Sequence, residues 1–86
     1  MESFVGRAVF IRTVTYHYTG RLVAESDTWL HLEDAAWIAD SGRWSKALTT
    51  GELAEVEPYP DGIVRIARSA VVDMCEWQHE PPREVK

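Results

Sequence analysis

Two side chains that lie far apart in the sequence, Trp29 and Arg68, have the chemistry of a contact with single-stranded RNA. An indole ring stacks on a base, and a guanidinium group binds a phosphate or stacks in turn. The competing interpretation is that Trp29 packs in a core or a subunit interface and that Arg68 pairs with an acidic neighbour. The formal net charge of -5 favours this second interpretation, because nucleic-acid binding depends on an excess of lysine and arginine.

The histidines and the single cysteine raise the question of a metal or catalytic site. His17 and His31, with Glu33 or Asp34, have the donor types of a zinc site. No ligand spacing supports such a site, so a surface or interface role is favoured and no metal or cofactor is predicted. Cys75 would need a nearby histidine to become a reactive thiolate, but its apolar segment favours an inert thiol. Because no Ser-His-Asp set and no phosphate-binding glycine loop is present either, we predict that the chain is not an enzyme.

The middle of the chain is predicted to contact another protein. Trp44 and Leu48 would share one face of a short helix, and Tyr59 would lie in the turn that follows. Exposed aromatic and apolar side chains of this kind are typical of protein–protein contacts. These three residues are therefore the predicted interaction residues.

An acidic stretch precedes that turn. Its carboxylates, from Glu52, Glu55 and Glu57, would suit a basic partner or a calcium ion, although a solvated loop is the favoured interpretation. Trp37, Trp44 and Trp77 are interpreted as core or interface residues rather than as parts of a ligand cage.

The composition indicates one small globular domain. A chain of 86 residues has room for one core, and 45% hydrophobic with 27% charged residues is ordinary for a folded protein. One cysteine excludes an intrachain disulfide and fits a reducing compartment. No apolar run approaches the length of a membrane span, and the first residues lack the pattern of a signal peptide. We therefore expect a cytoplasmic protein without membrane contact.

Alternating β-branched and aromatic residues predict short strands. The clearest predicted strand covers residues 8–14. One of its faces carries Val9, Ile11 and Thr13, and the other face carries the residues between them. Gly20 lies inside the second strand and indicates a bulge or a sharp bend, which a small barrel needs to close. The other strands are predicted at 17–24, 28–32, 35–39, 63–66 and 71–75, with turns near 14–16, 25–27 and 58–62.

One helix is predicted between these strands. Trp44, Ala47 and Leu48 follow the spacing of one apolar helix face, Gly51 is placed to end it, and residues 40–42 offer capping side chains. The predicted fold is therefore mostly β, a small and strongly bent SH3-like barrel of about five strands. Its domain covers residues 1–77 with an insertion at 40–62, and residues 78–86 form a flexible tail.

The order of these elements resembles the Sm-like family of small β-barrels. Residues 18–22 (YTGRL) resemble the family's aromatic-x-Gly-x-Leu signature, in which the glycine permits a strand bend. Residues 30–35 (LHLEDA) resemble its apolar-x-apolar-acidic-Asp-Ala stretch, and residues 67–72 (ARSAVV) are similar to its second motif. A set of phage-encoded proteins of unassigned function, in which such a barrel carries an insertion, is similar as well.

The resemblance implies a cyclic homo-oligomer of about five to seven subunits, closed by strand pairing between subunits. It implies a ring-forming structural or protein-interaction module, in the host cytoplasm if the chain is viral. An RNA-binding ring using Trp29 and Arg68 is the alternative. Two departures weaken that alternative: the family's RNA-contacting asparagine is missing near Trp29, and Ser69 replaces the glycine that follows the arginine.

Overall fold

The computed structural model describes residues 3–86, so that the first two residues of the predicted domain, Met1 and Glu2, lie outside the described residues. The fold is mostly β, as predicted, with every strand pair antiparallel. The sheet has the order β4-β3-β2-β1-β6, and β5 pairs with β3 as well. The elements are β1 (Ala8–Thr13), β2 (His17–Glu25), β3 (Trp29–Asp40), α1 (Trp44–Thr50), β4 (Glu55–Pro58), β5 (Val64–Ala67), a 3-10 helix (Arg68–Ala70) and β6 (Val71–Glu76).

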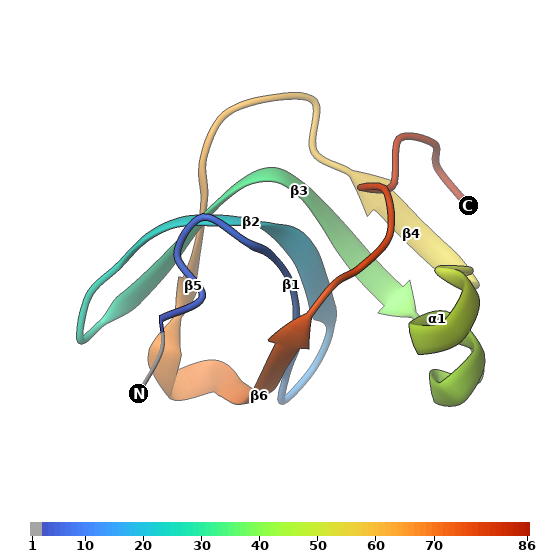
Figure 1. Cartoon of the computed structure of the whole chain (residues 1–86), viewed down its shortest axis with the longest axis horizontal. Helices are drawn as coiled ribbons and strands as arrows, with labels where there is room; N and C mark the ends of the chain where they lie inside the picture. The colour runs from blue at the N-terminus through green and yellow to red at the C-terminus, as the bar shows by residue number, and fades with distance from the viewer. Residues whose placement is uncertain (1–2) are drawn as a thin grey trace.

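The sheet curves strongly along β2 and β3 (Figure 1). The first part of β3 pairs with β5 and the last part with β4, so one long strand has two partners on the same edge. The prediction of two strands separated by a break at Glu33 and Asp34 was wrong. Asp34 adopts a positive φ of 51°, and the register of β2 against β3 shifts at this point, so the chain bends within one strand instead of ending it.

Gly20 lies opposite this bend and explains it sterically. A Cβ atom at Gly20 would lie 3.1 Å from the Leu32 Cβ and 3.2 Å from the Glu33 carbonyl oxygen. The register shift falls between Thr19 and Arg21, on either side of the glycine. The predicted bulge is therefore confirmed, and its cause is the close approach of β2 to β3.

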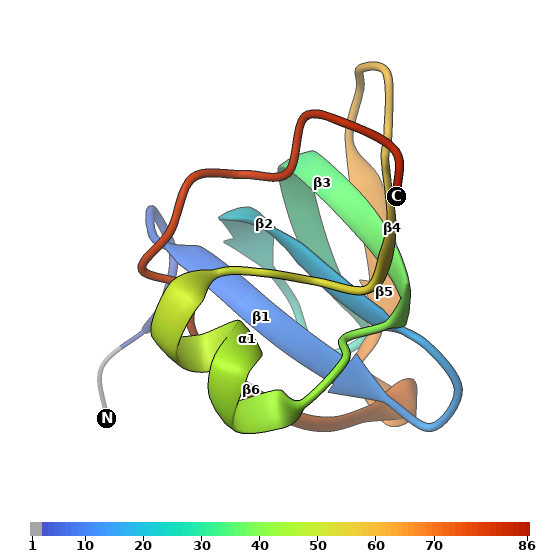
Figure 2. The ribbon, with the colours of Figure 1, turned by 90° about the vertical axis from the view of Figure 1, so that its right-hand side faces the viewer.

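Two hydrophobic cores lie on opposite faces of the sheet. The inner core, inside the curve, contains Val9 and Ile11 of β1. The outer core lies under α1 and the chain that follows it. It contains the fully buried Phe10, which lies between Val9 and Ile11 in the sequence. Figure 2 shows α1 lying across β1 on this outer face. The other inner-core residues are Leu22, Leu30, Leu32, Ala35 and Ile66, and the other outer-core residues are Ala36, Ile38, Ala47, Leu53, Val56 and Trp77.

The predicted helix is confirmed at Trp44–Thr50, and Gly51 ends it with a left-handed φ of 79°. The predicted side-chain cap was wrong, because the N-cap residue is Arg43 and its side chain makes no capping hydrogen bond. Asp40 instead accepts a hydrogen bond from the Gly42 N–H (2.7 Å) and shapes the turn before the helix. The acidic stretch that follows contains the unpredicted strand β4, whose single buried residue, Val56, is too weak a pattern to recognise.

The C-terminal segment, expected to be frayed, lies against the outer core. The backbones of Lys86 and Val56 exchange two hydrogen bonds (2.8 and 3.0 Å), which places the end of the chain beside β4. His79 Nε2 is hydrogen-bonded to the Leu48 carbonyl oxygen (2.8 Å). In Figure 2 the segment runs above α1 toward β4. Among residues 3–86, no helix is both long enough and apolar enough to cross a bilayer.

Replacing Gly51 by alanine is expected to destabilise the protein by about 1–3 kcal/mol. The left-handed backbone disfavours a side chain, and the new Cβ would lie 2.8 Å from the His79 Cγ. Urea unfolding measures the cost. Gly62→Ala is the matched control, because Gly62 has a φ of 87° and a Cβ there would meet no atom within 4 Å, so it reports backbone strain alone. An equal cost for both variants would show that His79 does not pack against Gly51.

Candidate functional site

Two strands of the sheet keep an unpaired edge within the described part of the chain. β5 pairs only with β3, and β6 pairs only with β1, whereas the outer side of β4 is hydrogen-bonded to the Lys86 backbone. Each strand therefore presents a row of backbone N–H and C=O groups on its outer side. In Figure 1, β5 lies at the left and β6 at the bottom, whereas α1 and β4 lie at the right.

The outer edge of β5 is identified from the hydrogen bond at its end. The Arg68 N–H donates to the Thr28 carbonyl oxygen (2.9 Å). Because bonding alternates along an antiparallel pair, the backbone groups of Arg65 and Ala67 point away from β3. Ile63, just before β5, is 52% exposed.

The outer edge of β6 follows from the same alternation. The Trp77 N–H donates to the Ala8 carbonyl oxygen (2.9 Å), so the backbone groups of Glu76 and Met74 point away from β1. Val72 on this strand is 60% exposed. Both free edges thus combine unpaired backbone groups with exposed hydrophobic side chains.

Trp29 and Arg68 are brought together beside the free edge of β5. Trp29 pairs with Ala67, the residue before Arg68, and is 40% exposed. The Arg68 guanidinium is already bonded: its Nε donates to the Ser26 carbonyl oxygen (2.5 Å), and its Nη2 lies 3.3 Å from the Glu25 carboxylate. The acidic neighbour of the competing interpretation is thus present, and Arg68 would have to leave it in order to bind a phosphate.

Trp44 and Leu48 both lie on α1, but their environments differ. Trp44 is half-buried, with its ring edge-on to Phe10 (4.9 Å between centroids) and the Arg12 guanidinium 5.0 Å from its ring centroid. Leu48 is 39% exposed. Trp44 therefore borders the outer core, and Leu48 is the residue of the pair that a partner would reach.

Tyr59 belongs to a different surface, which sequence reasoning missed. Trp37 lies opposite Tyr18 on β2 and opposite Glu57 on β4, so the three side chains form a row on one face of the sheet. The Tyr16 ring contacts Trp37 with centroids 4.7 Å apart, and Tyr59 follows Glu57 at the next position on the same face. We call this the aromatic face. Only the pairing of three strands assembles it, so no local pattern could reveal it.

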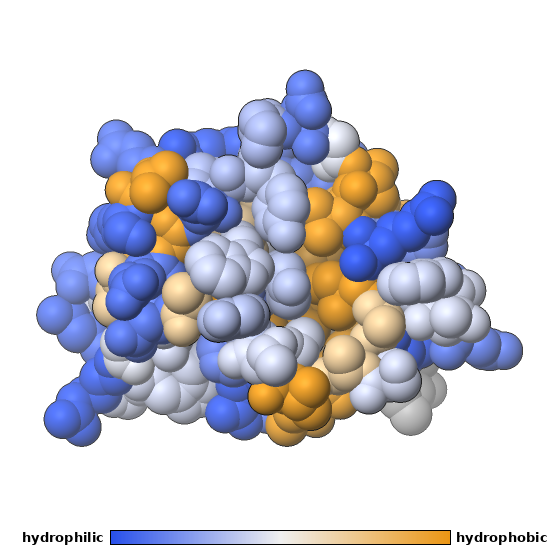
Figure 3. Space-filling model, turned by 180° about the vertical axis from the view of Figure 1, so that it is seen from behind, coloured by the Kyte–Doolittle hydropathy of each residue, from blue (hydrophilic) through white to orange (hydrophobic). Residues whose placement is uncertain are grey.

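The aromatic face continues the inner face of the sheet beyond the end of β5. Tyr18 packs against the inner core, and Trp37 and Tyr59 extend outward from it. In Figure 3, which shows the molecule from behind, side chains of intermediate hydropathy in pale colours lie beside hydrophobic residues in orange at the middle of the face. Burial raises the pKa of Tyr59, and the nearby Tyr18 adds to the shift, so Tyr59 carries a neutral hydroxyl at pH 7.

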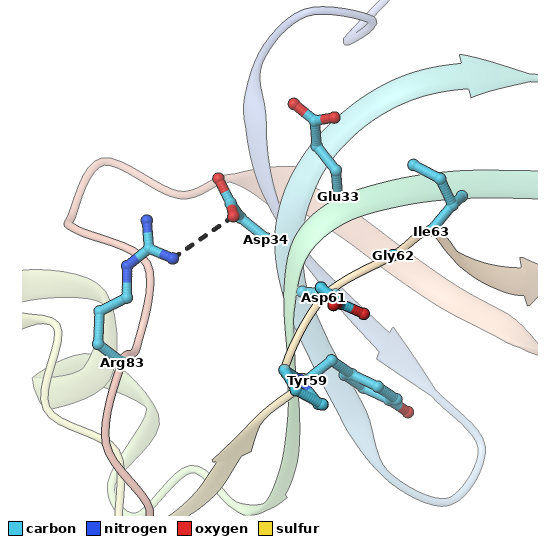
Figure 4. A pocket seen from close by; sticks show the side chains of 9 residues that line it. Glu33, Asp34, Tyr59, Asp61, Gly62, Ile63 and Arg83 are labelled. Atoms are coloured by element: carbon cyan, nitrogen blue, oxygen red, sulfur yellow. Dashed lines mark hydrogen bonds and ion pairs between the residues drawn. The ribbon is translucent and has the colours of Figure 1, made fainter.

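Two hollows flank Tyr59. One, of about 360 Å³, is lined by Trp37, Glu57, Pro58, Tyr59 and Pro60. The other, of about 350 Å³, includes the ion pair of Arg83 with Asp34 (3.4 Å). Figure 4 shows this pair on one side of the loop between β4 and β5, with the Tyr59 ring and Asp61 pointing to the other side.

The proposed zinc donors do not come together. His17 pairs with Ile38 and His31 pairs with Ala24, near opposite ends of β2. Within residues 3–86, no group of three or more His, Cys, Asp or Glu side chains is arranged to hold a metal ion. Burial raises the pKa of the Cys75 thiol, which therefore stays protonated at neutral pH.

Asp73 on β6 is expected to give the protein a small pH-dependent stability. Its hydrogen bond from the Arg12 Nε (2.8 Å) lowers the pKa of the carboxyl group. Because the pKa is lower in the folded protein, the ionised carboxylate stabilises the fold when the pH is above the ordinary aspartate pKa of about 3.9. This stabilisation is lost as the pH falls through the pKa of the folded state. Asp73→Asn should therefore lower the urea midpoint at pH 6.5 but not at pH 2. The difference should be small, because both groups are exposed to solvent. An equal loss at both pH values would contradict the ionic origin.

Comparison of the chain with models of protein families, with curated proteins and with solved structures finds no match. The resemblance to the Sm-like family therefore stays a prediction, and the function is inferred from the geometry.

Proposed function

We propose that the protein is a ring-forming structural or protein-interaction module of the Sm-like kind. The observation that supports this is the presence of two unpaired edges, on β5 and on β6, in one small chain. Because the two edges are different surfaces of one subunit, β5 of one copy pairs with β6 of the next in a head-to-tail contact. Such a contact repeats until it closes into a ring, and closure leaves no edge exposed.

The hydrophobic residues beside the two edges support the same pairing. Ile63, Val72 and Trp29 are each 40% exposed or more in the single chain. Pairing the edges would cover such side chains, and backbone hydrogen bonds would set the register. A small domain also gains stability by assembling, since its own core is limited.

The solution mass of the purified protein tests the ring. Light scattering at low micromolar concentration should give one discrete mass that corresponds to about five to seven subunits of 9.8 kDa. A stable mass of 9.8 kDa would contradict the ring and leave an isolated barrel. A continuous rise of mass with concentration would contradict closure, because an open head-to-tail contact forms filaments.

An RNA-binding ring is the alternative, and the closeness of Trp29 and Arg68 is the observation in its favour. The bond of Arg68 to Glu25 and the net charge of -5 count against it. Binding of a short uridine-rich or adenine-rich single strand, measured at several salt concentrations, distinguishes the two. RNA binding should weaken steeply as salt rises, whereas an interaction module should show no binding at any salt.

The insertion at residues 40–62 is the part that we propose for contacts with another protein. It supplies α1, with Leu48 exposed, and the aromatic and proline residues around Tyr59. We also infer a cytoplasmic location, from the single cysteine and the absence of any possible intrachain disulfide.

A further inference from the structure

We propose that the hollow between Trp37 and Tyr59 binds an arginine side chain in a basic segment of a partner protein. Trp37 and Glu57 are cross-strand neighbours, so an aromatic ring and a carboxylate project from the same face at adjacent positions. Tyr59 and Pro60 supply the remaining walls of this hollow of about 360 Å³. Aromatic faces beside one carboxylate match a guanidinium group, which stacks on rings and donates paired hydrogen bonds to a carboxylate's two oxygens.

The charges around the hollow favour a cation. Within residues 3–86, neither Glu57 nor Asp61 has an ion-pair partner. In contrast, the nearby Asp34 is paired with Arg83. The two unpaired carboxylates lie on a chain with a net charge of -5, so the field at the hollow attracts a basic segment.

Two other occupants fit less well. A nucleic acid base would stack on Trp37 and Tyr59, but its phosphates would lie near the Glu57 carboxylate, which repels them. An uncharged apolar segment would cover the rings and would bury the Glu57 carboxylate without a partner, which is costly. Arginine is favoured over lysine because its flat group covers the rings and is more weakly hydrated.

This inference rests on the part of the proposed function that assigns protein contacts to the insertion. It does not depend on ring formation, because the hollow lies along β3 and β4, whereas the proposed subunit contacts use β5 and β6. Light scattering on the same samples therefore separates failure of the ring from failure of this site.

The test is a titration of the full chain, labelled with 5-fluorotryptophan, with the peptide acetyl-Gly-Ser-Arg-Ser-Gly-amide at physiological salt. Fluorine NMR resolves the four tryptophans, and the Trp37→Phe variant identifies the Trp37 resonance. That resonance should move with saturation while the other three stay in place. A peptide with citrulline, which has the same shape without the charge, should bind about tenfold more weakly.

Two matched variants locate the charge. Glu57→Gln should weaken the arginine peptide about tenfold, since it removes the carboxylate beside Trp37. Glu52→Gln removes the same charge from the chain after α1, where Glu52 pairs with Lys46 (3.0 Å), and should leave binding unchanged. Both residues are exposed, so neither variant is expected to disturb the fold.

Several results would overturn the site. If the citrulline peptide shifted the Trp37 resonance as much as the arginine peptide does, the hollow would not recognise the charge. If both glutamine variants weakened binding of the arginine peptide equally, the peptide would be attracted only by the net charge of the protein. A shift of the Trp37 resonance on simple dilution would show that a second copy of the chain covers the hollow. A shift with a uridine-rich strand and none with the arginine peptide would assign the aromatic face to nucleic acid.

Discussion

Replacing Arg65 by proline is expected to convert the assembled protein into a monomer of 9.8 kDa. Arg65 lies on β5 with its N–H directed away from β3, so proline removes a donor that only a neighbouring subunit would use. Proline is tolerated in an edge strand at such positions, and an extended Val64 before it suits the restriction that proline imposes. The mass by light scattering should fall about five- to sevenfold.

The control for this variant separates the backbone from the side chain. Arg65→Ala removes the same charged group but keeps the N–H, so it should assemble like the wild-type protein. Circular dichroism and urea unfolding should show that both variants remain folded. A proline variant with the wild-type mass would mean that β5 does not carry the subunit contact, and a monomeric alanine variant would transfer the contact to the guanidinium group.

Replacing Phe10 by alanine is expected to remove about 3–5 kcal/mol from the free energy of unfolding. Phe10 is fully buried on the outer face of β1, and its ring contacts Trp44, Trp77 (5.5 Å) and His17 (5.8 Å). A chain of this size has a total free energy of unfolding of roughly 4–13 kcal/mol, so the loss is a large part of its stability. The ring joins β1 to α1 and to the chain after β6, and a cavity there would loosen the whole outer core.

Urea unfolding followed by far-ultraviolet circular dichroism measures this loss. With a slope of about 1 kcal/mol per molar urea, the midpoint should fall by roughly 3 M or more. Val14→Ala is the control, because Val14 is 75% exposed in the turn after β1 and should leave the midpoint unchanged. An unchanged midpoint for the Phe10 variant would show that the outer core contributes little to the stability of the barrel.

Local patterns in the sequence predicted the mostly-β fold and much of its detail. The alternation through residues 8–14 correctly divided Val9 and Ile11 from Phe10, because neighbouring strand residues point to opposite faces. Gly20 correctly marked the bulge, since a glycine inside a strand usually signals a close approach of backbone. The helix and its end at Gly51 followed from the spacing of apolar residues and from the conformational freedom of glycine.

The features that were predicted wrongly or not predicted at all depend on contacts between distant segments. Glu33 and Asp34 look like a strand break, but β3 pairs with β2 both before and after Asp34, so the positive φ there bends the strand without ending it. β4 has only one buried residue and forms because β3 offers an edge. The last residues carry no apolar pattern, yet Lys86 pairs with Val56 beside β4.

The candidate sites divide in the same way. Residue type alone indicated which side chains have the chemistry of a contact, such as Trp29, Arg68 and Tyr59. Their neighbours depend on the folding of the whole chain: Arg68 is bonded to Glu25, and Tyr59 lines a hollow together with Trp37 and Glu57. Strand register is a property of pairs of distant segments, and it determines which side chains share a face.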